Sequence, residues 1–203
     1  MRYDLQVIAS WIKPGSRVLD LGCGEGELLL YLKKEKAVKG TGIESSEAKV
    51  EKCFEKGLQV LQGDITEEVR DYPDNTFDYV ILSQTLQQVL KPDMLIKELL
   101  RVGKKIIVSF PNFSYWSIRL QILFFGYAPK NQQLPYEWYN TPNIRIITIK
   151  DFRRFVRETG CRVLKEVDIN THSHDLQGKI VSFLPNLRAT YGIFLVGRRN
   201  EKS

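Results

Sequence analysis

Hydrophobic positions in the first half of the chain alternate between short apolar runs, typical of buried strands, and stretches with helical spacing. The short runs predict strands over residues 17–21, 38–43, 57–62, 77–82 and 105–110. The helical patterns predict helices over about residues 3–13, 25–36, 46–56 and 92–101. Because strands that alternate with helices are joined by right-handed crossovers, this half of the sequence predicts a parallel sheet.

The pattern changes after Pro111. Residues 112–126 are dense in aromatic side chains, and residues 134–143 form an irregular, polar and aromatic segment. A helix over about residues 150–159 and two last strands, near 162–168 and 190–197, complete a predicted seven-stranded sheet. Because we find no linker, repeat or low-complexity tract, we expect a single α/β domain, residues 1–203, with a cap or flap over about residues 112–147.

The aromatic stretch from Phe113 to Tyr127 has more than one interpretation. We favour an amphipathic helix that covers the edge of the sheet. The alternatives are a lid over a substrate and a patch that docks another protein. The same alternatives apply to the later aromatic and polar side chains of this segment: Tyr136, Trp138, Tyr139 and Asn140.

Composition and charge exclude several classes of protein. The chain has a formal charge of +6, but it lacks the dense basic tracts and basic–aromatic repeats of nucleic-acid-binding proteins. No apolar run is long enough to span a bilayer, and the N-terminus has no apolar signal core. The cysteines, Cys23, Cys53 and Cys161, show neither zinc spacing nor a disulfide framework. We therefore expect a cytoplasmic protein that binds neither nucleic acid nor membrane.

The clearest motif is the glycine-rich stretch from Arg17 to Leu29, which reads Asp20-x-Gly22-x-Gly24-x-Gly26. It predicts a strand, a tight turn without side-chain bulk, and a helix N-terminus, where open α/β folds bind ligands. The acid before the glycines would repel a phosphate but would attract an ammonium group. The pattern resembles the first motif of class I S-adenosylmethionine (SAM) methyltransferases. The alternative is a tight turn with a purely structural role.

Three acids stand at the ends of the first three predicted strands. Asp20, Glu44 and Asp64 are expected to face one cleft, since consecutive parallel strands end at the same edge of a sheet. Glu44 is placed to accept hydrogen bonds from both ribose hydroxyls, and Asp64 from an adenine amine. Asp20 would lie near the amino group of the methionine part. The alternative is that these acids are exposed strand-end or helix-capping residues.

Ser83 and Gln84, at the end of the fourth strand, are predicted to lie near the transferable methyl group, although Gln84 is equally consistent with a helix-cap neighbour. Methyl transfer depends largely on alignment of the reacting atoms, and no general base is evident. His172 and His174 flank Ser173 in a polar loop, which favours a solvated loop over a metal site. We therefore predict no metal.

Longer blocks of sequence carry a more specific resemblance. They are Gly15–Gly24, Phe77–Gln87 (FDYVILSQTLQ), Arg101–Gly103, Val108–Phe113 (VSFPNF) and Leu134–Ile144 (LPYEWYNTPNI). In these blocks the sequence resembles the methionine biosynthesis MetW family, within the class I SAM methyltransferase superfamily. The resemblance runs from the N-terminus to about residue 165 and more loosely to the end. One difference is at Ser46, near which the family often has an acid.

The resemblance implies a Rossmann-like class I methyltransferase fold and a cofactor, SAM or S-adenosylhomocysteine. The residues that it predicts to bind the cofactor are Asp20, Gly22, Cys23, Gly24, Gly26, Glu44, Ser45, Asp64, Ile65 and Ser83. It also implies a partner protein, a homoserine O-acyltransferase of the MetX type, whose activity this chain would support. SAM binding would then serve as feedback control, since SAM is made from methionine.

An active methyltransferase with a small-molecule acceptor is the alternative function. For that reaction the catalytic residues are not identified, and the candidates that would contact or orient an acceptor are Gln84, Tyr136, Tyr139 and Asn140.

Overall fold

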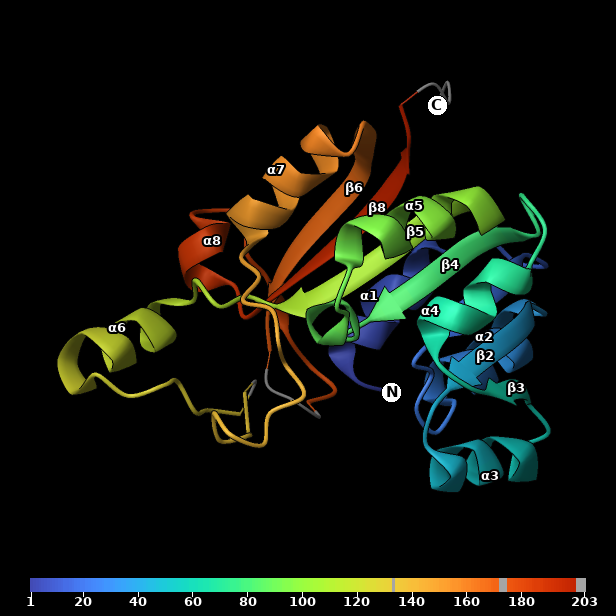
Figure 1. Cartoon of the computed structure of the whole chain (residues 1–203), viewed down its shortest axis with the longest axis horizontal. Coiled ribbons are helices and arrows are strands. Elements are labelled where there is room, and N and C mark those ends of the chain that lie inside the picture. The colour runs from blue at the N-terminus through green and yellow to red at the C-terminus, as the bar shows by residue number, and fades with distance from the viewer. Residues whose placement is uncertain (133, 172–174, 200–203) are drawn as a thin grey trace.

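A computed structural model describes residues 1–132, 134–171 and 175–199 of the chain. Its centre is one eight-stranded sheet (Figure 1) with the strand order β3-β2-β1-β4-β5-β8-β6-β7. The strands are β1 (Arg17–Leu21), β2 (Lys39–Glu44), β3 (Gln59–Gln62), β4 (Phe77–Ser83), β5 (Gly103–Pro111), β6 (Cys161–Asn170), β7 (Lys179–Ile180) and β8 (Tyr191–Arg198). The first five strands pair in parallel, and β8, β6 and β7 add antiparallel pairs at one side.

Helices connect and cover these strands. They are α1 (Tyr3–Trp11), α2 (Glu27–Lys36), α3 (Glu47–Glu55), α4 (Ile65–Glu68), α5 (Pro92–Val102), α6 (Trp116–Phe125), α7 (Ile149–Glu158) and α8 (Pro185–Arg188), with the short 3₁₀ turns η1 (Val69–Asp71) and η2 (Leu86–Gln88). The seven strands and the longer helices predicted from the sequence are present. The predicted strand number was wrong by one, because the two-residue strand β7 is too short to give a periodic pattern.

The core lies in two layers, one on each face of the sheet. Side chains along β4 alternate between them, with Tyr79 and Ile81 in one layer and Val80 and Leu82 in the other. Helices α1 and α2 share the first layer, and α5 and α7 share the second. Because both faces are covered, the β1–β4 and β4–β5 pairs are buried, and ligand access is left to the ends of the strands.

Residues 112–147, here called the arm, leave the body of the protein at the end of β5. The base of the arm is closed by a hydrogen bond from the Phe113 N–H to the carbonyl of Ile147, at 3.1 Å. The Asn112 side chain is buried and donates to the carbonyls of Asn186 and Ala189, at 3.1 and 2.9 Å. These contacts fix where the arm begins and ends.

Helix α6 projects from the body (Figure 1), so the prediction that it covers the edge of the sheet was wrong. Of its residues only Ile118 is buried, whereas Phe124 and Phe125 are each 70% exposed. The physical reason is that apolar residues lie all around this helix, so its sequence defines no single face for packing on the sheet.

Candidate functional site

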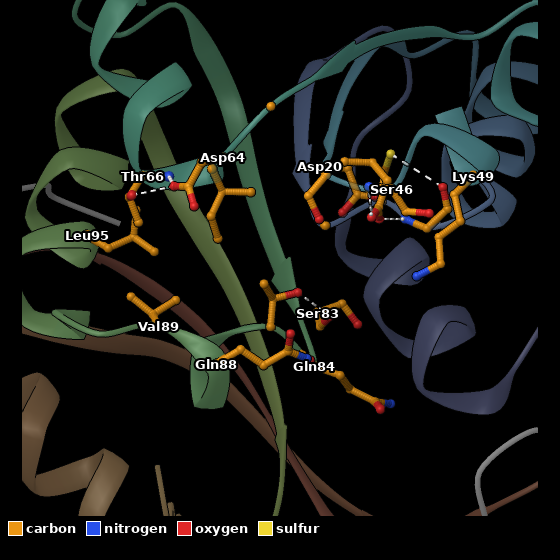
Figure 2. A pocket seen from close by; sticks show the side chains of 18 of the residues that line it. Asp20, Ser46, Lys49, Asp64, Thr66, Ser83, Gln84, Gln88, Val89 and Leu95 are labelled. Carbon is orange, nitrogen blue, oxygen red and sulfur yellow. Dashed lines mark hydrogen bonds between the residues drawn. The ribbon is translucent and has the colours of Figure 1, made fainter. Parts of the chain in front are cut away.

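A large cavity opens at the carboxyl ends of the parallel strands (Figure 2), with a volume of about 1670 Å³. The predicted cofactor residues that line it are Asp20, Gly22, Cys23, Gly24, Glu44, Ser45, Asp64, Ile65 and Ser83. They come from the ends of β1, β2 and β4 and from the turn after β3, which the parallel topology brings to one edge. The structure therefore brings these predicted residues together around one cavity.

Gly26 is the predicted cofactor residue that does not line this cavity. It is the N-cap of α2, in the left-handed conformation with φ of 74°. A side chain at this position would collide with Leu58, which packs beneath the turn. Its role is therefore to let the helix start close to α3 and β3, behind the surface that faces a ligand.

The other two glycines of the turn are also left-handed, with φ of 72° at Gly22 and 58° at Gly24. A Cβ at Gly22 would lie 2.7 Å from the Thr85 hydroxyl, so Gly22 allows the loop after β4 to pack on the turn. A Cβ at Gly24 would meet no atom within 4 Å. Because Gly24 lines the cavity and has no side chain, a ligand has room to lie in van der Waals contact with its Cα.

Glu44 is held by two backbone donors and is buried. Its Oε2 accepts the N–H of Gly24 at 2.9 Å, and its Oε1 accepts the N–H of Ser46 at 3.0 Å. A carboxylate oxygen has two lone pairs, so each oxygen can accept one further hydrogen bond, as a ribose diol requires. The carboxylate thus has a fixed orientation toward the cavity.

Asp20 is 3% exposed at the end of β1. Burial raises the pKa of its carboxyl to about 7; the positive charge of Arg2 opposes this shift, and the nearby Glu44 adds to it. A cationic group of a ligand beside Asp20 would lower this pKa and favour the ionised form. The site therefore favours a positive charge at this end of the cavity.

Asp64 is both a lining residue and the N-cap of α4. Its Oδ1 accepts the Thr66 N–H at 2.7 Å and also the Thr66 hydroxyl. These hydrogen bonds, led by that of the Thr66 hydroxyl, lower the pKa of the Asp64 carboxyl. The capping interpretation of Asp64 is therefore confirmed, and it is compatible with a contact to a ligand because the residue also faces the cavity.

Cys23 is a neutral thiol packed behind the turn. Its pKa is raised, chiefly by burial, and the neighbouring Cys53 also has a raised pKa for the same main reason. Cys53 donates to the carbonyl of Gly24 at 3.3 Å. The two thiols shape and support the turn.

Ser83 and Gln84 form the wall at the end of β4. The Ser83 hydroxyl lies 3.0 Å from the Ser109 hydroxyl. Gln84 is in the left-handed region with φ of 53°, and its carbonyl accepts from the Gln87 side chain at 2.7 Å. A strained residue that lines a cavity and is held by side-chain bonds is a frequent feature of binding sites.

Two N-terminal residues at this site escaped sequence reasoning. Arg2 lines the cavity, and its Nε and Nη2 donate to Oδ1 and Oδ2 of Asp4, at 3.2 and 3.1 Å. Asp4 is 3% exposed and also accepts from the Gln84 side chain, at 2.7 Å. In the sequence Asp4 resembles an ordinary first-turn acid of a helix, so no local signal marks this cluster.

None of the described residues of the arm lines the cavity. Tyr136, Tyr139 and Asn140, predicted as possible acceptor contacts, are exposed in the arm and are not among the described residues that line it. Gln84 is the remaining acceptor candidate, and it does line the cavity. The structure therefore separates the cofactor candidates from most of the acceptor candidates.

Besides the polar side chains at the strand ends, apolar side chains that include Val89 and Leu95 line the cavity (Figure 2). Small-molecule sites commonly occupy about 300–1,000 Å³. The cavity is larger than that, so a bound nucleoside would leave part of it open.

No group of three or more potential metal-ligating side chains occurs within residues 1–132, 134–171 and 175–199. His172 and His174 lie outside the described residues. None of the described helices is long and apolar enough to cross a membrane.

Sequence comparisons connect this geometry with known families. Residues 2–196 match the family model described as methionine biosynthesis protein MetW. The chain is 35% identical, over 214 residues, to the bifunctional methionine biosynthesis protein MetXA/MetW of Rhodopirellula baltica. That alignment covers 99% of this chain and 33% of the relative, so the chain spans about a third of the relative's length. A demethylmenaquinone methyltransferase of Staphylococcus aureus is 28% identical over 73% of this chain and 69% of its own.

Solved structures share the fold. A SAM-dependent methyltransferase of Thermotoga maritima, described as a possible histamine N-methyltransferase, superposes with a TM-score of 0.68 at 20% identity, over 97% of this chain and 87% of its own. A SAM-dependent methyltransferase of Archaeoglobus fulgidus gives a TM-score of 0.68 at 16% identity, over 96% of this chain and 91% of its own. The predicted Rossmann-like methyltransferase fold is thereby confirmed.

Proposed function

The chain belongs to the MetW family of methionine biosynthesis proteins, and from this premise we propose that it binds SAM or S-adenosylhomocysteine and supports a MetX-type homoserine O-acyltransferase. In this proposal the cavity is the ligand site and the arm contacts the partner.

The observation that carries the ligand proposal is the arrangement of acids around the glycine turn. Glu44 is fixed by the turn itself, and Asp20 and Asp64 line the same cavity. In the proposed complex Glu44 accepts from the ribose hydroxyls and Asp64 from the adenine amine. Asp20 attracts the ammonium group of the methionine part, and Gly24 lets the ligand lie against the backbone.

The partner proposal rests on the relative from Rhodopirellula baltica, whose name joins MetXA and MetW in one bifunctional protein. Fusion of two modules in one relative supports association of the separate modules in another. The arm supports the same proposal, because large apolar side chains such as Leu123, Phe124 and Trp138 are at least 70% exposed there. Exposed apolar surface of this kind commonly marks a protein interface.

Reconstitution tests the partner proposal. The homoserine O-acyltransferase of the same organism is assayed alone and with this protein, and the mixture is analysed by size-exclusion chromatography. We expect co-elution and a higher acylation rate in the mixture. Separate elution together with an unchanged rate would contradict the proposal.

An active methyltransferase is the second candidate, favoured by the space beyond the end of β4. The cavity extends past Ser83 and Gln84 to Val89 and Leu95, which would accommodate an acceptor next to the methyl group. Incubation with labelled SAM and a metabolite extract should then give a methylated product that the Gly24→Arg variant cannot make. Absence of product from broad extracts would count against this candidate.

The cytoplasmic location remains part of this proposal. Its support is that Cys23, Cys53 and Cys161 are free thiols in the structure, as is usual in a reducing compartment.

A further inference from the structure

We propose that Arg2, positioned by Asp4, binds the α-carboxylate of the ligand's amino-acid part, so that the cavity selects adenosine derivatives with a complete α-amino-acid group. This inference rests on the proposed SAM site and deepens it. It assigns a ligand contact to an N-terminal residue that lies outside the glycine-rich motif.

The first argument is the shared position of Arg2 and Asp20. Both residues line the same cavity, and the charge of Arg2 lowers the pKa of the Asp20 carboxyl, against the effect of burial. An α-amino acid carries an ammonium and a carboxylate on one carbon atom. A site that binds it needs an acceptor and a cation near each other, and Asp20 and Arg2 provide this pair.

The second argument is that Arg2 has a fixed orientation. Asp4 holds the Nε and Nη2 atoms of the guanidinium, at 3.2 and 3.1 Å, and these two bonds do not use Nη1. A guanidinium has five N–H donors, so the group can bind Asp4 and a second carboxylate together. Asp4 is almost fully buried, which makes it a positioning residue.

The third argument is that the same buried acid also positions a wall of the cavity. Asp4 accepts from the side chain of Gln84 at 2.7 Å, and both Gln84 and Arg2 line the cavity. Removing a carboxylate from water is costly, and the three donors that Arg2 and Gln84 provide help to offset this cost for Asp4. Such an arrangement is expected where donors must be oriented at a ligand.

Two of the other cations that line the cavity already have partners. Arg70 pairs with Glu67 at 3.1 Å, and Lys56 donates to the carbonyl of Glu25 at 2.6 Å. Neither is among the charges that shift the pKa of Asp20. Arg2 is therefore the lining arginine whose charge acts on Asp20.

The test compares two ligands by calorimetry. SAM has the carboxylate, whereas decarboxylated SAM keeps the adenosine, the sulfonium and the amine. We expect the unmodified protein to bind SAM about tenfold to a hundredfold more tightly than decarboxylated SAM, as for a lost charge-assisted hydrogen bond. In Arg2→Gln the ratio of the two affinities should fall to about one. The reason is that SAM should bind more weakly, whereas the affinity for decarboxylated SAM should not change.

Three variants complete the experiment. Arg2→Lys, which keeps the charge without the planar fork, should retain part of the ratio, and Asp4→Asn should reduce it by releasing Arg2. Arg70→Gln is the matched control, an arginine that lines the cavity elsewhere, and should leave the ratio unchanged. Thermal melting of each variant shows whether the fold is intact.

The outcomes separate this inference from the proposal beneath it. If SAM binds but Arg2→Gln keeps the ligand ratio of the unmodified protein, the role of Arg2 is wrong and the SAM site stands. If the unmodified protein binds both ligands equally, the carboxylate is not recognised, and the inference is again wrong. If it binds neither ligand, the SAM site and the role of Arg2 fail together.

Discussion

The carboxylate of Glu44 and the backbone N–H of Gly24 are joined by a hydrogen bond of 2.9 Å. It ties the end of β2 to the turn that follows β1, so the acid and the glycine that are both proposed to contact the ligand hold each other in place. The second oxygen of Glu44 accepts from Ser46 and fixes the start of α3. The proposed ligand contact and the local structure therefore depend on the same side chain.

Glu44→Gln should weaken SAM binding about tenfold or more, because an amide has one acceptor oxygen and cannot accept from both backbone donors. The N–H left without a partner should also lower the free energy of unfolding by about 1–3 kcal/mol. Calorimetry and urea unfolding measure the two effects. Glu51→Gln, an exposed change on the neighbouring α3, is the control and should alter neither. Equal SAM affinity in both variants would show that Glu44 does not contact the ligand.

Gly24→Ala should mainly lose SAM binding, whereas Gly26→Ala should mainly lose thermal stability. At Gly24 the added Cβ meets no protein atom within 4 Å, so the fold should lose only about 1–2 kcal/mol from the left-handed backbone. The Cβ would lie where the ligand approaches, so SAM binding should be largely lost. At Gly26 the Cβ collides with Leu58, so thermal stability should fall further. A Gly24→Ala protein with normal SAM affinity would refute the contact at Gly24.

The Asp20 carboxyl should make both stability and binding depend on pH. Burial raises its pKa in the folded protein from 3.8 to about 7, so the folded state binds this proton more tightly than the unfolded state does. Ionisation of Asp20 therefore lowers the free energy of unfolding of the ligand-free protein progressively as pH rises from 3.8 to about 7. Above that pH the loss of stability stays constant. Asp20→Asn should melt at a higher temperature than the unmodified protein at pH 8, and the difference should shrink as pH falls.

SAM binding should show the opposite preference at Asp20. The ligand ammonium favours the ionised carboxylate, so SAM affinity should rise as pH increases through about 7. In Asp20→Asn this rise should be absent and the affinity lower at pH 8. Calorimetry at a series of pH values measures the SAM affinity of both proteins. If the affinity of the unmodified protein and that of Asp20→Asn change with pH in the same way, Asp20 is not the source of the pH dependence.

The arm should bind the partner without contributing to the stability of the body. Phe124 and Phe125 are each 70% exposed, so the double change to Ser should leave the melting temperature nearly unchanged. The same change should weaken binding to the homoserine O-acyltransferase, measured by surface plasmon resonance. Phe54→Ser, at a 57% exposed position on α3, is the control for loss of an exposed aromatic ring. Equal partner affinity in all three proteins would exclude this part of the arm from the interface.

The sequence was sufficient for features that depend on local pattern. Strand runs, the glycine turn and strand-end acids such as Glu44 and Asp64 follow from periodicity and from the rule that parallel strands end at one edge. The short elements α4 and β7 could not be predicted, since two to four residues show no period.

Long-range placement was the other feature that the sequence did not reveal. Asp4 meets Gln84 across 80 positions of sequence, through packing of α1 beside the end of β4. The direction of α6 depends on how Asn112 and Ile147 fix the base of the arm. In both cases the tertiary contacts, and no local preference, determine the position.

Calorimetric titration of SAM into the purified protein, alone and then with saturating homoserine O-acyltransferase, tests the central claim most directly. The account predicts saturable binding in the first titration and a different SAM affinity in the second. Because linkage is reciprocal, SAM should change the affinity for the acyltransferase by the same factor. Unchanged SAM affinity in the presence of the partner would contradict feedback control through this protein. An absence of SAM binding in both titrations would contradict the ligand site itself.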